Sequence, residues 1–324
     1  MKKILGVLGL LLAVVVATTV LSAQPDGTYT FLSAYNLENL AQRIGMFGIL
    51  SIAAAFVILT GGIDLSIGSV VCVAGCMLPW LLRDVGADPL VAVPAVLAMC
   101  AGIGLWHGIL VVGLRLQPFV VTLCGLLLYR GLMRWFTNDQ TMGLGTGLDG
   151  LRWFATGRIP LFAGFSLPVA ALVLLAVAVV AAVFLGRTVW GRHLFALGRN
   201  EEAARFSGVA TGRLTVLAYV TCSLLAGLGG ILFVLYVNSA TAASTGNFFE
   251  LYAIAGAVLG GVALRGGEGT VLGVVLGAAL MQVLSNAIVL VGSSNQLEFA
   301  IVGGVILAGA AADELVRRLV RRRR

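Results

Sequence analysis

The chain has 324 residues, of which 60% are hydrophobic and only 11% are charged, and its net charge is +7. A soluble domain carries roughly 25% charged residues, so a water-soluble protein of this length would lack the polar side chains to cover its surface. The composition therefore excludes a cytosolic enzyme and indicates an integral membrane protein. The 43 glycines agree, because small residues let membrane helices approach closely.

The charged residues exclude two further classes of protein. Lys2 and Lys3 are the only lysines, and neither follows a glycine-rich loop. A phosphate-binding P-loop needs a lysine after its glycines, so we expect no ATP hydrolysis by that route. The positive charge lies in loops and at the C-terminus, which argues against a nucleic-acid-binding surface.

The cysteines and histidines do not suggest a metal site. All five cysteines lie inside apolar runs, and His107 and His193 are far apart in the sequence. We expect the cysteines to be small core residues, and we expect no metal or other cofactor in this chain.

Ten stretches are long enough to span a bilayer, which takes about 20 apolar residues in a helix. They are residues 4–22, 42–60, 63–82, 90–113, 117–136, 161–186, 214–237, 248–264, 270–291 and 297–312. Polar, glycine-rich breaks interrupt 42–82 and 248–291. The sequence thus predicts an all-α integral membrane protein, a polytopic bundle of about ten transmembrane helices, some of them broken, in a single transmembrane domain over residues 1–324.

The first stretch has a second interpretation. Lys2 and Lys3 precede an apolar run that ends at Leu21-Ser22-Ala23, which also fits a cleavable signal peptide. The run is long for a signal sequence, so we favour a retained helix. Residue 24 lies outside in either case.

Positive charge in short loops predicts the orientation. With the N-terminus inside, fifteen of the 21 lysines and arginines fall on the inner side and six on the outer side. The outer six are Arg43, Arg83, Arg130, Arg134, Arg152 and Arg158. We therefore expect both termini to be cytoplasmic, with a partly ordered outer loop at 137–160 and an arginine-rich inner loop at 187–213.

The first polar break contains Asp64, within Gly61-Gly62-Ile63-Asp64-Leu65-Ser66. An ionisable residue at membrane depth is costly and usually faces a partner or a cavity, so Asp64 is a functional candidate. The alternative is a helix-capping aspartate whose carboxylate accepts backbone N–H groups. Residues 260–264 (GGVAL) weakly repeat the pattern of residues 61–65 (GGIDL), and chance similarity and a true repeat remain equally open.

The inner loop contains a predicted short helix at about 201–207. Asn200 is a good N-cap, Glu201 and Glu202 suit the positive end of a helix, and Gly208 is a plausible stop. Ala203, Ala204 and Phe206 would form an apolar ridge, which suggests a docking element for another protein. The alternative is an amphipathic turn that lies on lipid headgroups.

Polar residues follow two of the apolar stretches. One set is Gln117 to Thr122, and the other runs from Asn238 to Glu250, where we expect it to cluster toward the outer face. Hydroxyls, amides and a carboxylate near aromatic rings suit a neutral polyhydroxylated solute, although an ordinary solvated loop is the alternative. For Gln282 and Asn286 we favour hydrogen bonds between helices over a pore lining.

Four blocks of the sequence resemble the membrane permease subunits of bacterial ABC sugar importers, the ribose/xylose/arabinose/galactofuranose permease family. They are residues 58–69 (ILTGGIDLSIGS), 117–131 (QPFVVTLCGLLLYRG), 191–209 (GRHLFALGRNEEAARFSGV) and 249–262 (FELYAIAGAVLGGV), the last followed by Gly266-Gly267-Glu268-Gly269-Thr270. The similarity runs from about residue 36 to 310. It departs from the family at the doubled acidic pair Glu201-Glu202, at Phe249, and over the loop 137–160.

The resemblance implies a multi-pass permease in the bacterial inner membrane that works as a homo- or heterodimer. Its partners would be a cytoplasmic P-loop ATPase, which binds the ATP and Mg²⁺, and a sugar-binding protein on the outer face. The coupling segment that enters the ATPase would consist of Asn200, Glu201, Glu202, Ala203, Ala204, Arg205, Phe206, Ser207 and Gly208. The residues expected along the translocation path or its gate are Asp64, Ser66, Gln117, Thr122, Asn238 and Glu250.

Two other classes of protein remain as alternatives. An ion-coupled secondary carrier or channel would work without an ATPase, but such proteins typically carry more buried ionisable groups. A membrane enzyme acting on lipid would need a catalytic constellation near one interface, and the sequence shows none. The residues do not reveal which sugar is carried.

Overall fold

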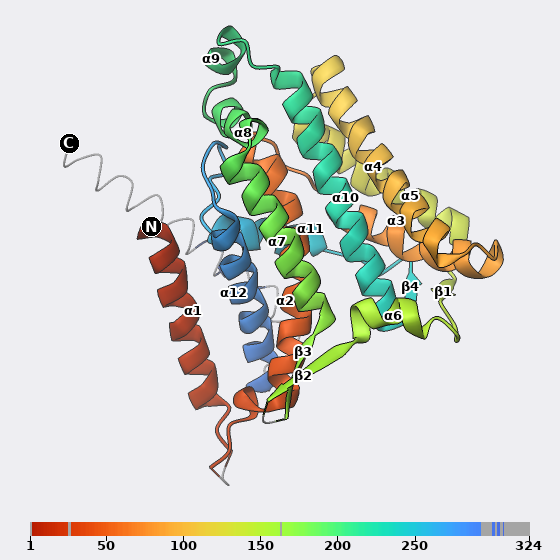
Figure 1. Ribbon diagram of the computed structural model, residues 1–324, viewed down its shortest axis with the longest axis vertical. Coiled ribbons are helices and arrows are strands. Elements are labelled where there is room, and N and C mark those ends of the chain that lie inside the picture. Colours follow the sequence, from red (N-terminus) through yellow and green to blue (C-terminus); the bar gives the residue numbers. More distant parts are fainter. Residues whose placement is uncertain are drawn as a thin grey trace.

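The computed structural model describes residues 2–24, 27–162 and 164–292, together with residues 300, 301, 303, 304 and 307 near the C-terminus. In this part of the chain, eight helices are long and apolar enough to cross a membrane (Figure 1). They are α1 (Lys2–Leu21), α2 (Ala34–Leu59), α3 with its continuing turn η2 (Ile67–Pro79 and Trp80–Asp84), α4 (Pro89–Gly113), α5 (Pro118–Thr137), α7 (Val169–Arg187), α10 (Thr211–Val237) and α12 (Val271–Leu290). The prediction of an all-α polytopic membrane protein is confirmed.

Shorter elements connect these helices. They are η1 (Thr30–Leu32), β1 (Thr141–Gly143), α6 (Asp149–Thr156), β2 (Arg158–Phe162), β3 (Phe165–Pro168), α8 (Val189–Arg199), α9 (Glu201–Phe206), β4 (Ser239–Thr241) and α11 (Phe249–Leu259). The strands form two small antiparallel sheets, β1 with β4 and β2 with β3. The expected loop at 137–160 is therefore ordered.

The prediction that residues 248–264 span the whole membrane is wrong. α11 covers only Phe249–Leu259, which is about 16 Å of helix at 1.5 Å per residue, against a hydrocarbon core of about 30 Å. Gly261, with φ +89°, ends the helix in a left-handed turn. α11 therefore reaches only partway through the membrane.

Two other spans begin at different residues from those expected. The span expected at 161–186 begins as the β2–β3 hairpin and becomes helical only at Val169. α2 begins at Ala34, eight residues before the expected start, because the Ser33 side chain caps it by accepting from the Asn36 amide. The tenth span, 297–312, lies almost entirely outside the described residues and stays a prediction.

α2 is the central helix of the bundle. It packs against α7, α10, α11 and α12, and nearly every residue from Ile49 to Leu59 is buried. The second half of α2 is therefore enclosed by the neighbouring helices. α1 stands at the edge of the bundle, packs on α12, and buries few of its own residues.

Glycine pairs bring α11 and α12 into backbone contact. Gly256 and Gly260 of α11 face Gly273 and Gly277 of α12, and each helix carries its two glycines four residues apart. A Cβ atom on Gly277 would overlap the carbonyl oxygen of Gly256, and one on Gly260 would overlap that of Gly273. The two helices therefore meet through the small-residue spacing that membrane helices use for close packing.

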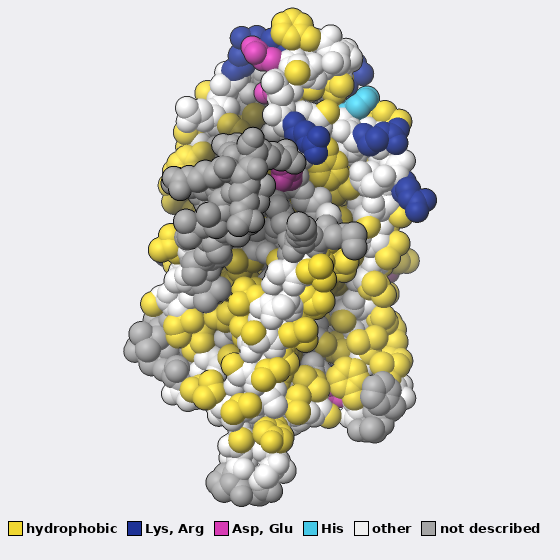
Figure 2. Space-filling view, turned by 90° about the vertical axis from the view of Figure 1, so that its left-hand side faces the viewer, with side chains coloured by type: hydrophobic (Ala, Val, Ile, Leu, Met, Phe, Trp, Pro, Cys, Tyr) yellow, Lys and Arg dark blue, Asp and Glu magenta, His cyan; other side chains and the backbone are white. Residues whose placement is uncertain are grey.

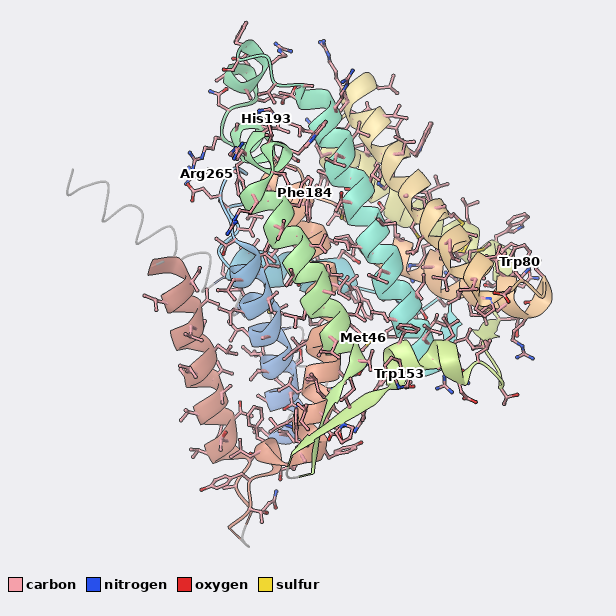
Figure 3. The ribbon with its side chains drawn as sticks, viewed as in Figure 1. Met46, Trp80, Trp153, Phe184, His193 and Arg265 are labelled. Carbon is pink, nitrogen blue, oxygen red and sulfur yellow. The ribbon has the colours of Figure 1, made fainter. Side chains whose placement is uncertain are left out.

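The two ends of the molecule differ in character. α8 and α9 form one end, here called the α9 end, and the β-strands with α6 form the other, called the sheet end (Figure 1). On the face shown in Figure 2, the arginines gather at the α9 end. His193 and Arg265 lie at the α9 end, whereas Trp153 lies toward the sheet end (Figure 3). This separation of charge follows the inner and outer sides predicted from the sequence.

Candidate functional site

The chain leaves helical geometry between α2 and α3, inside the buried interior. α2 ends in a turn in which Gly61 adopts φ +85°, and the amides of Gly61 and Gly62 bond to the carbonyls of Ile58 and Val57. Residues 62–66 are then non-helical until α3 begins at Ile67. Non-helical backbone at membrane depth is tolerated where it is buried in protein or lines a cavity, which makes this segment a candidate site.

Asp64 sits in this break with only 2% of its surface exposed. Its Oδ1 atom accepts hydrogen bonds from the Ser66 amide at 2.8 Å and from the Ser66 hydroxyl at 2.6 Å. The carboxylate thus organises the turn that leads into α3, but it is not the cap of that helix, whose N-cap residue is Ser66. Its buried Oδ2 atom accepts no hydrogen bond from the residues that the structure describes, so the turn with Ser66 accounts for only one of the two oxygens.

Side chains from three further helices surround the break. Thr122 of α5 donates to the carbonyl of Ile63 at 3.2 Å, and the Tyr219 hydroxyl of α10 lies 2.8 Å from the point that a Cβ on Gly62 would occupy. His107 Nε2 and Tyr129 Oη are 2.9 Å apart, and the His107 ring meets the Tyr219 ring edge to face. We call Asp64, Ser66, His107, Thr122, Tyr129 and Tyr219 the polar ring.

Three members of the polar ring, His107, Tyr129 and Tyr219, are not among the path residues predicted from the sequence. His107 is an isolated histidine in an apolar stretch, and Tyr219 lies in another stretch without polar motifs. Both are fully buried, and His107 Nδ1 and the Tyr219 hydroxyl join Asp64 Oδ2 among the buried polar atoms without a hydrogen-bond partner among the described residues. Buried polar groups are normally paired, which marks the polar ring as an unusual site.

Glu250, the last residue of the second predicted polar set, is also buried. It is 6% exposed, and its carboxylate packs against the α-carbon of Gly68 in the first turn of α3. Arg130 of α5 secures the segment before it by donating to the carbonyls of Ala242 at 3.1 Å and Thr245 at 2.7 Å. The segment 242–250 is therefore attached to the start of α3 and to α5.

The remaining two path candidates lie in different places. Asn238 ends α10 with φ +68°, and its Nδ2 atom lies 3.4 Å from the carbonyl of Gly145 near the sheet end. The helix between Tyr219 and Asn238 is about 28 Å long, so Asn238 is far from the break. Gln117 is exposed at the start of α5, but the next residue, Pro118, lies 3.6 Å from the point that a Cβ on Gly62 would occupy. The structure thus brings Asp64, Ser66, Thr122 and Glu250 to the start of α3, places Gln117 at the border of this site, and leaves Asn238 near the sheet end.

The preference for interhelical bonds at Gln282 and Asn286 is confirmed. Arg43 Nε of α2 donates to Gln282 Oε1 at 3.1 Å, and Asn36 and Asn286 exchange hydrogen bonds of 3.1 and 2.8 Å. These polar side chains join α2 to α12.

The predicted short helix at the α9 end is confirmed. Asn200 Oδ1 accepts from the Ala203 amide at 2.9 Å, the helix runs from Glu201 to Phe206, and Gly208 follows with φ +82°. Phe206 is 84% exposed, which is an unfavourable position for a free aromatic ring. Ala204, however, is buried, so the apolar ridge predicted from the sequence does not include it.

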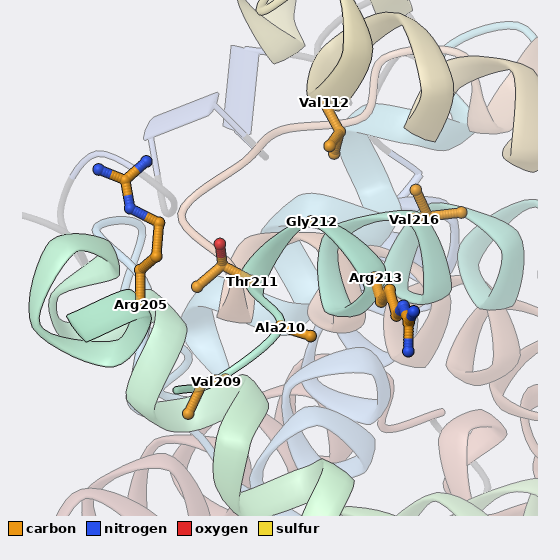
Figure 4. A pocket seen from close by; sticks show the side chains of 8 residues that line it. All are labelled: Val112, Arg205, Val209, Ala210, Thr211, Gly212, Arg213 and Val216. Carbon is orange, nitrogen blue, oxygen red and sulfur yellow. The ribbon is translucent and has the colours of Figure 1, made fainter. Parts of the chain in front are cut away.

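An open groove of about 610 Å³ adjoins α9 (Figure 4). Val112 of α4 and Val216 of α10 contribute apolar lining, while Arg205 and Arg213 flank the groove. Together with the exposed Phe206, the groove makes the α9 end an irregular surface with apolar and cationic parts.

The sheet end is held by a buried carboxylate. Glu38 of α2 accepts from the Ser166 amide at 2.6 Å and forms an ion pair with Arg158 of β2. The Thr141 and Thr241 hydroxyls, 3.0 Å apart, join β1 to β4. Within the described residues, no group of three or more His, Cys, Asp or Glu side chains is arranged to hold a metal ion.

The comparisons with known proteins identify the class. Residues 36–310 match the family model described as the permease component of branched-chain amino acid transport systems. The chain is 36% identical over 285 residues to the ribose import permease protein RbsC of Escherichia coli (strain K12), covering 87% of each chain. It is 32% identical over 314 residues to the protein of the same name from Bacillus subtilis (strain 168), covering 97% of this chain and 93% of that one.

A third relative is named for a different sugar. The fructose import permease protein FrcC of Rhizobium meliloti is 28% identical over 292 residues, which cover 89% of this chain and 80% of that one. No solved structure matches the chain. The family match covers the polar ring, the segment 242–250 and α9 alike. The chain therefore belongs to this family of transport permeases, and it is the membrane-spanning permease component of an ABC importer.

Proposed function

We propose that this permease forms the membrane path for a monosaccharide or a similar polyol, delivered by a binding protein on one side and released on the other with energy from a separate ATPase. The observation that carries the proposal is the combination of sugar-import relatives with a capped, exposed helix α9 at one end of the bundle. Two of the relatives described above are named for ribose and one for fructose, so the substrate class rather than the individual sugar is inferred.

The α9 end faces the cytoplasm in this proposal. Arginines are concentrated there, as the charge rule for inner loops requires. The coupling segment Asn200–Gly208 docks on the ATPase, with Phe206 entering an apolar pocket and Glu201 and Glu202 meeting cations. Burying a phenylalanine ring that is 84% exposed contributes roughly 1.5–3 kcal/mol to this docking.

The path itself passes the start of α3. Asp64, Ser66, Thr122 and Glu250 gather there, and one carboxylate oxygen each of Asp64 and Glu250 remains without a partner among the described residues. Hydroxyls and carboxylates of this kind suit the hydroxyl groups of a sugar. Gln117 borders this site beside Gly62, Asn238 contributes near the sheet end, and the sheet end receives the binding protein.

The test is uptake of radiolabelled monosaccharides by proteoliposomes that contain this permease, its ATPase and its binding protein. Replacement of Glu201, Glu202 and Phe206 together is expected to abolish ATP-dependent uptake while the permease remains folded. A matched control is Trp190→Ala, an exposed aromatic residue of α8, which is expected to leave uptake unchanged.

Two outcomes would overturn the proposal. Unchanged uptake in the triple variant would remove α9 from the coupling role. Ion-driven uptake by the permease alone, without ATP or ATPase, would identify an ion-coupled secondary carrier instead.

A further inference from the structure

Three segments that are distant in sequence meet at one point of the α9 end. They are the end of α2, the end of α8 and the loop between α11 and α12. The carbonyl oxygen of Leu59 accepts a 3.0 Å hydrogen bond from the Gly267 amide. Arg199 Nε donates to the carbonyl of Gly267 at 3.3 Å. We call Leu59, Gly198, Gly266 and Gly267 the glycine junction.

The contacts of the glycine junction are backbone against backbone. A Cβ atom on Gly198 would overlap both Leu59 O and Gly267 N. A Cβ atom on Gly266 would lie 2.8 Å from Gly61 N and 3.0 Å from the α-carbon of Gly198. Gly266 and Gly267 have φ values of +85° and +72°, which glycine adopts without strain. No side chain separates the three segments, so a displacement of one is not absorbed by rotamer changes.

The glycine junction lies at the two helix breaks. α2 and α11 end in the same turn, because Gly61 and Gly261 both have positive φ and each turn has the same pair of backbone hydrogen bonds. In the first turn these bonds end at Ile58 and Val57, and in the second at Val258 and Ala257. Both turns are followed by non-helical backbone that leads into α3 and α12.

The turn is shared, but the helices beyond it are arranged differently. α11 and α12 pack directly on each other, whereas α10 packs against both α2 and α3. The two breaks are therefore similar only in the turn that ends each helix near the glycine junction. It does not extend to a repeat of the whole unit.

Gly198 connects the glycine junction to α9. It lies in the last turn of α8, and Asn200 alone separates α8 from α9 while capping the latter. A rigid movement of α9 therefore reaches Gly198 through two residues. The buried polar ring is attached to the same break, since Asp64 lies three residues after Gly61.

We propose that the glycine junction transmits the movement of the docked α9 to both helix breaks at once, so that the starts of α3 and α12 respond together. Gly198 is the positioning residue of this link, and it acts through the backbone of Leu59 and Gly267 without touching the sugar. The inference rests on the proposed function, because it assumes that an ATPase docks on α9.

The experiment compares Gly198→Ala with Gly186→Ala in the complete transporter of permease, ATPase and binding protein. A methyl group added to Gly186 of α7 would meet no heavy atom within 4 Å apart from local backbone, so this position is a matched control. Gly198→Ala is expected to retain the ATPase and to hydrolyse ATP at the normal rate, with sugar uptake per ATP reduced about tenfold, as expected for the loss of a typical coupling between two sites. Gly186→Ala is expected to behave as the parent.

A second measurement on the parent transporter keeps the inference testable if Gly198→Ala fails to fold. Hydrogen exchange of peptides covering residues 57–66 and 260–270 is followed with and without ATP. Both peptides are expected to change their protection together, and a change in only one of them overturns the inference. A Gly198→Ala transporter with the parental ratio of sugar to ATP also overturns it. Absence of a bound ATPase in the parent protein would instead overturn the proposed function.

Discussion

The carboxylate of Glu250 in α11 lies directly against the α-carbon of Gly68 in α3, with the carbonyl oxygen of Gly246 beside it. Neither an apolar helix nor a polar loop alone would suggest this contact. It arises because the first turn of α3 has no side chain at residue 68, which leaves room for a charged residue from a segment more than half the chain away.

Gly68→Ala tests this contact. The added methyl group would overlap Glu250 Oε2 and Gly246 O, and inserting atoms into a packed interior typically costs about 1–3 kcal/mol. We expect the purified permease to unfold at a lower temperature and to lose uptake. Gly131→Ala on α5, where nothing lies within 4 Å of the new methyl group, is the control. Equal melting temperatures for the two variants would contradict the described packing.

Asp64 is expected to tolerate an amide better than a methyl group. Asparagine retains an oxygen that accepts from the Ser66 amide and hydroxyl, whereas Asp64→Ala leaves those two buried donors without their partner, at about 1–3 kcal/mol. We expect Asp64→Ala to abolish uptake or assembly and Asp64→Asn to assemble with reduced uptake.

Sugar uptake and the yield of the complex with the ATPase check this prediction. Asp149→Ala, at an exposed position in the first turn of α6, serves as the control carboxylate. Parental uptake by Asp64→Ala would remove this residue from the functional site.

His107 and Tyr129 are expected to be energetically coupled. Their 2.9 Å hydrogen bond is buried between α4 and α5, and a neutral hydrogen bond of this kind contributes about 0.5–1.5 kcal/mol. A double-mutant cycle with His107→Phe and Tyr129→Phe measures the coupling from thermal or denaturant unfolding. A second cycle, which pairs His107→Phe with Thr141→Ala at the sheet end, should be additive within about 0.5 kcal/mol. Additivity in both cycles would refute the bond.

Glu38→Gln is expected to loosen the sheet end. The buried carboxylate accepts from the Ser166 amide and pairs with Arg158, and its loss leaves the β2–β3 hairpin without its ionic contact to α2, at about 1–3 kcal/mol. Limited proteolysis of the hairpin and thermal unfolding report the change.

The exposed pair of Arg134 and Asp139 provides the control for Glu38→Gln. Hydrogen bonds from Arg134 of 2.8 and 2.7 Å hold the pKa of Asp139 below its usual range. A carboxyl group whose pKa is lowered on folding stabilises the folded state at pH values above the pKa that the group has in the unfolded chain. This contribution is lost as the pH falls through the pKa of the folded state. Because both side chains are in solvent, screening makes the pair weak. The Arg134→Ala variant should therefore unfold at the same temperature as the parent protein. If Glu38→Gln also unfolds at the same temperature as the parent protein, the ionic contact does not hold the hairpin.

Local signals in the sequence predicted several features well. The helix α9 followed from Asn200, which caps it, and from Gly208, which stops it. The break after α2 followed from Gly61 and Gly62. Such features depend on residues within one or two turns of each other, because caps and left-handed turns are made by neighbours in the chain.

The amino-acid sequence by itself determined that this protein is a helical membrane protein, because composition and apolar run length decide that property. The permease class came from the resemblance of its four motif blocks to a known family. Tertiary structure alone decided that α11 is a partial span, that Glu250 is buried, that His107 and Tyr219 lie at the break that holds Asp64, and that Gly198 meets Leu59 and Gly267. Each of these depends on contacts between segments far apart in the chain. The sequence around a glycine or a histidine does not indicate which backbone segment or aromatic ring will pack against it in the folded protein.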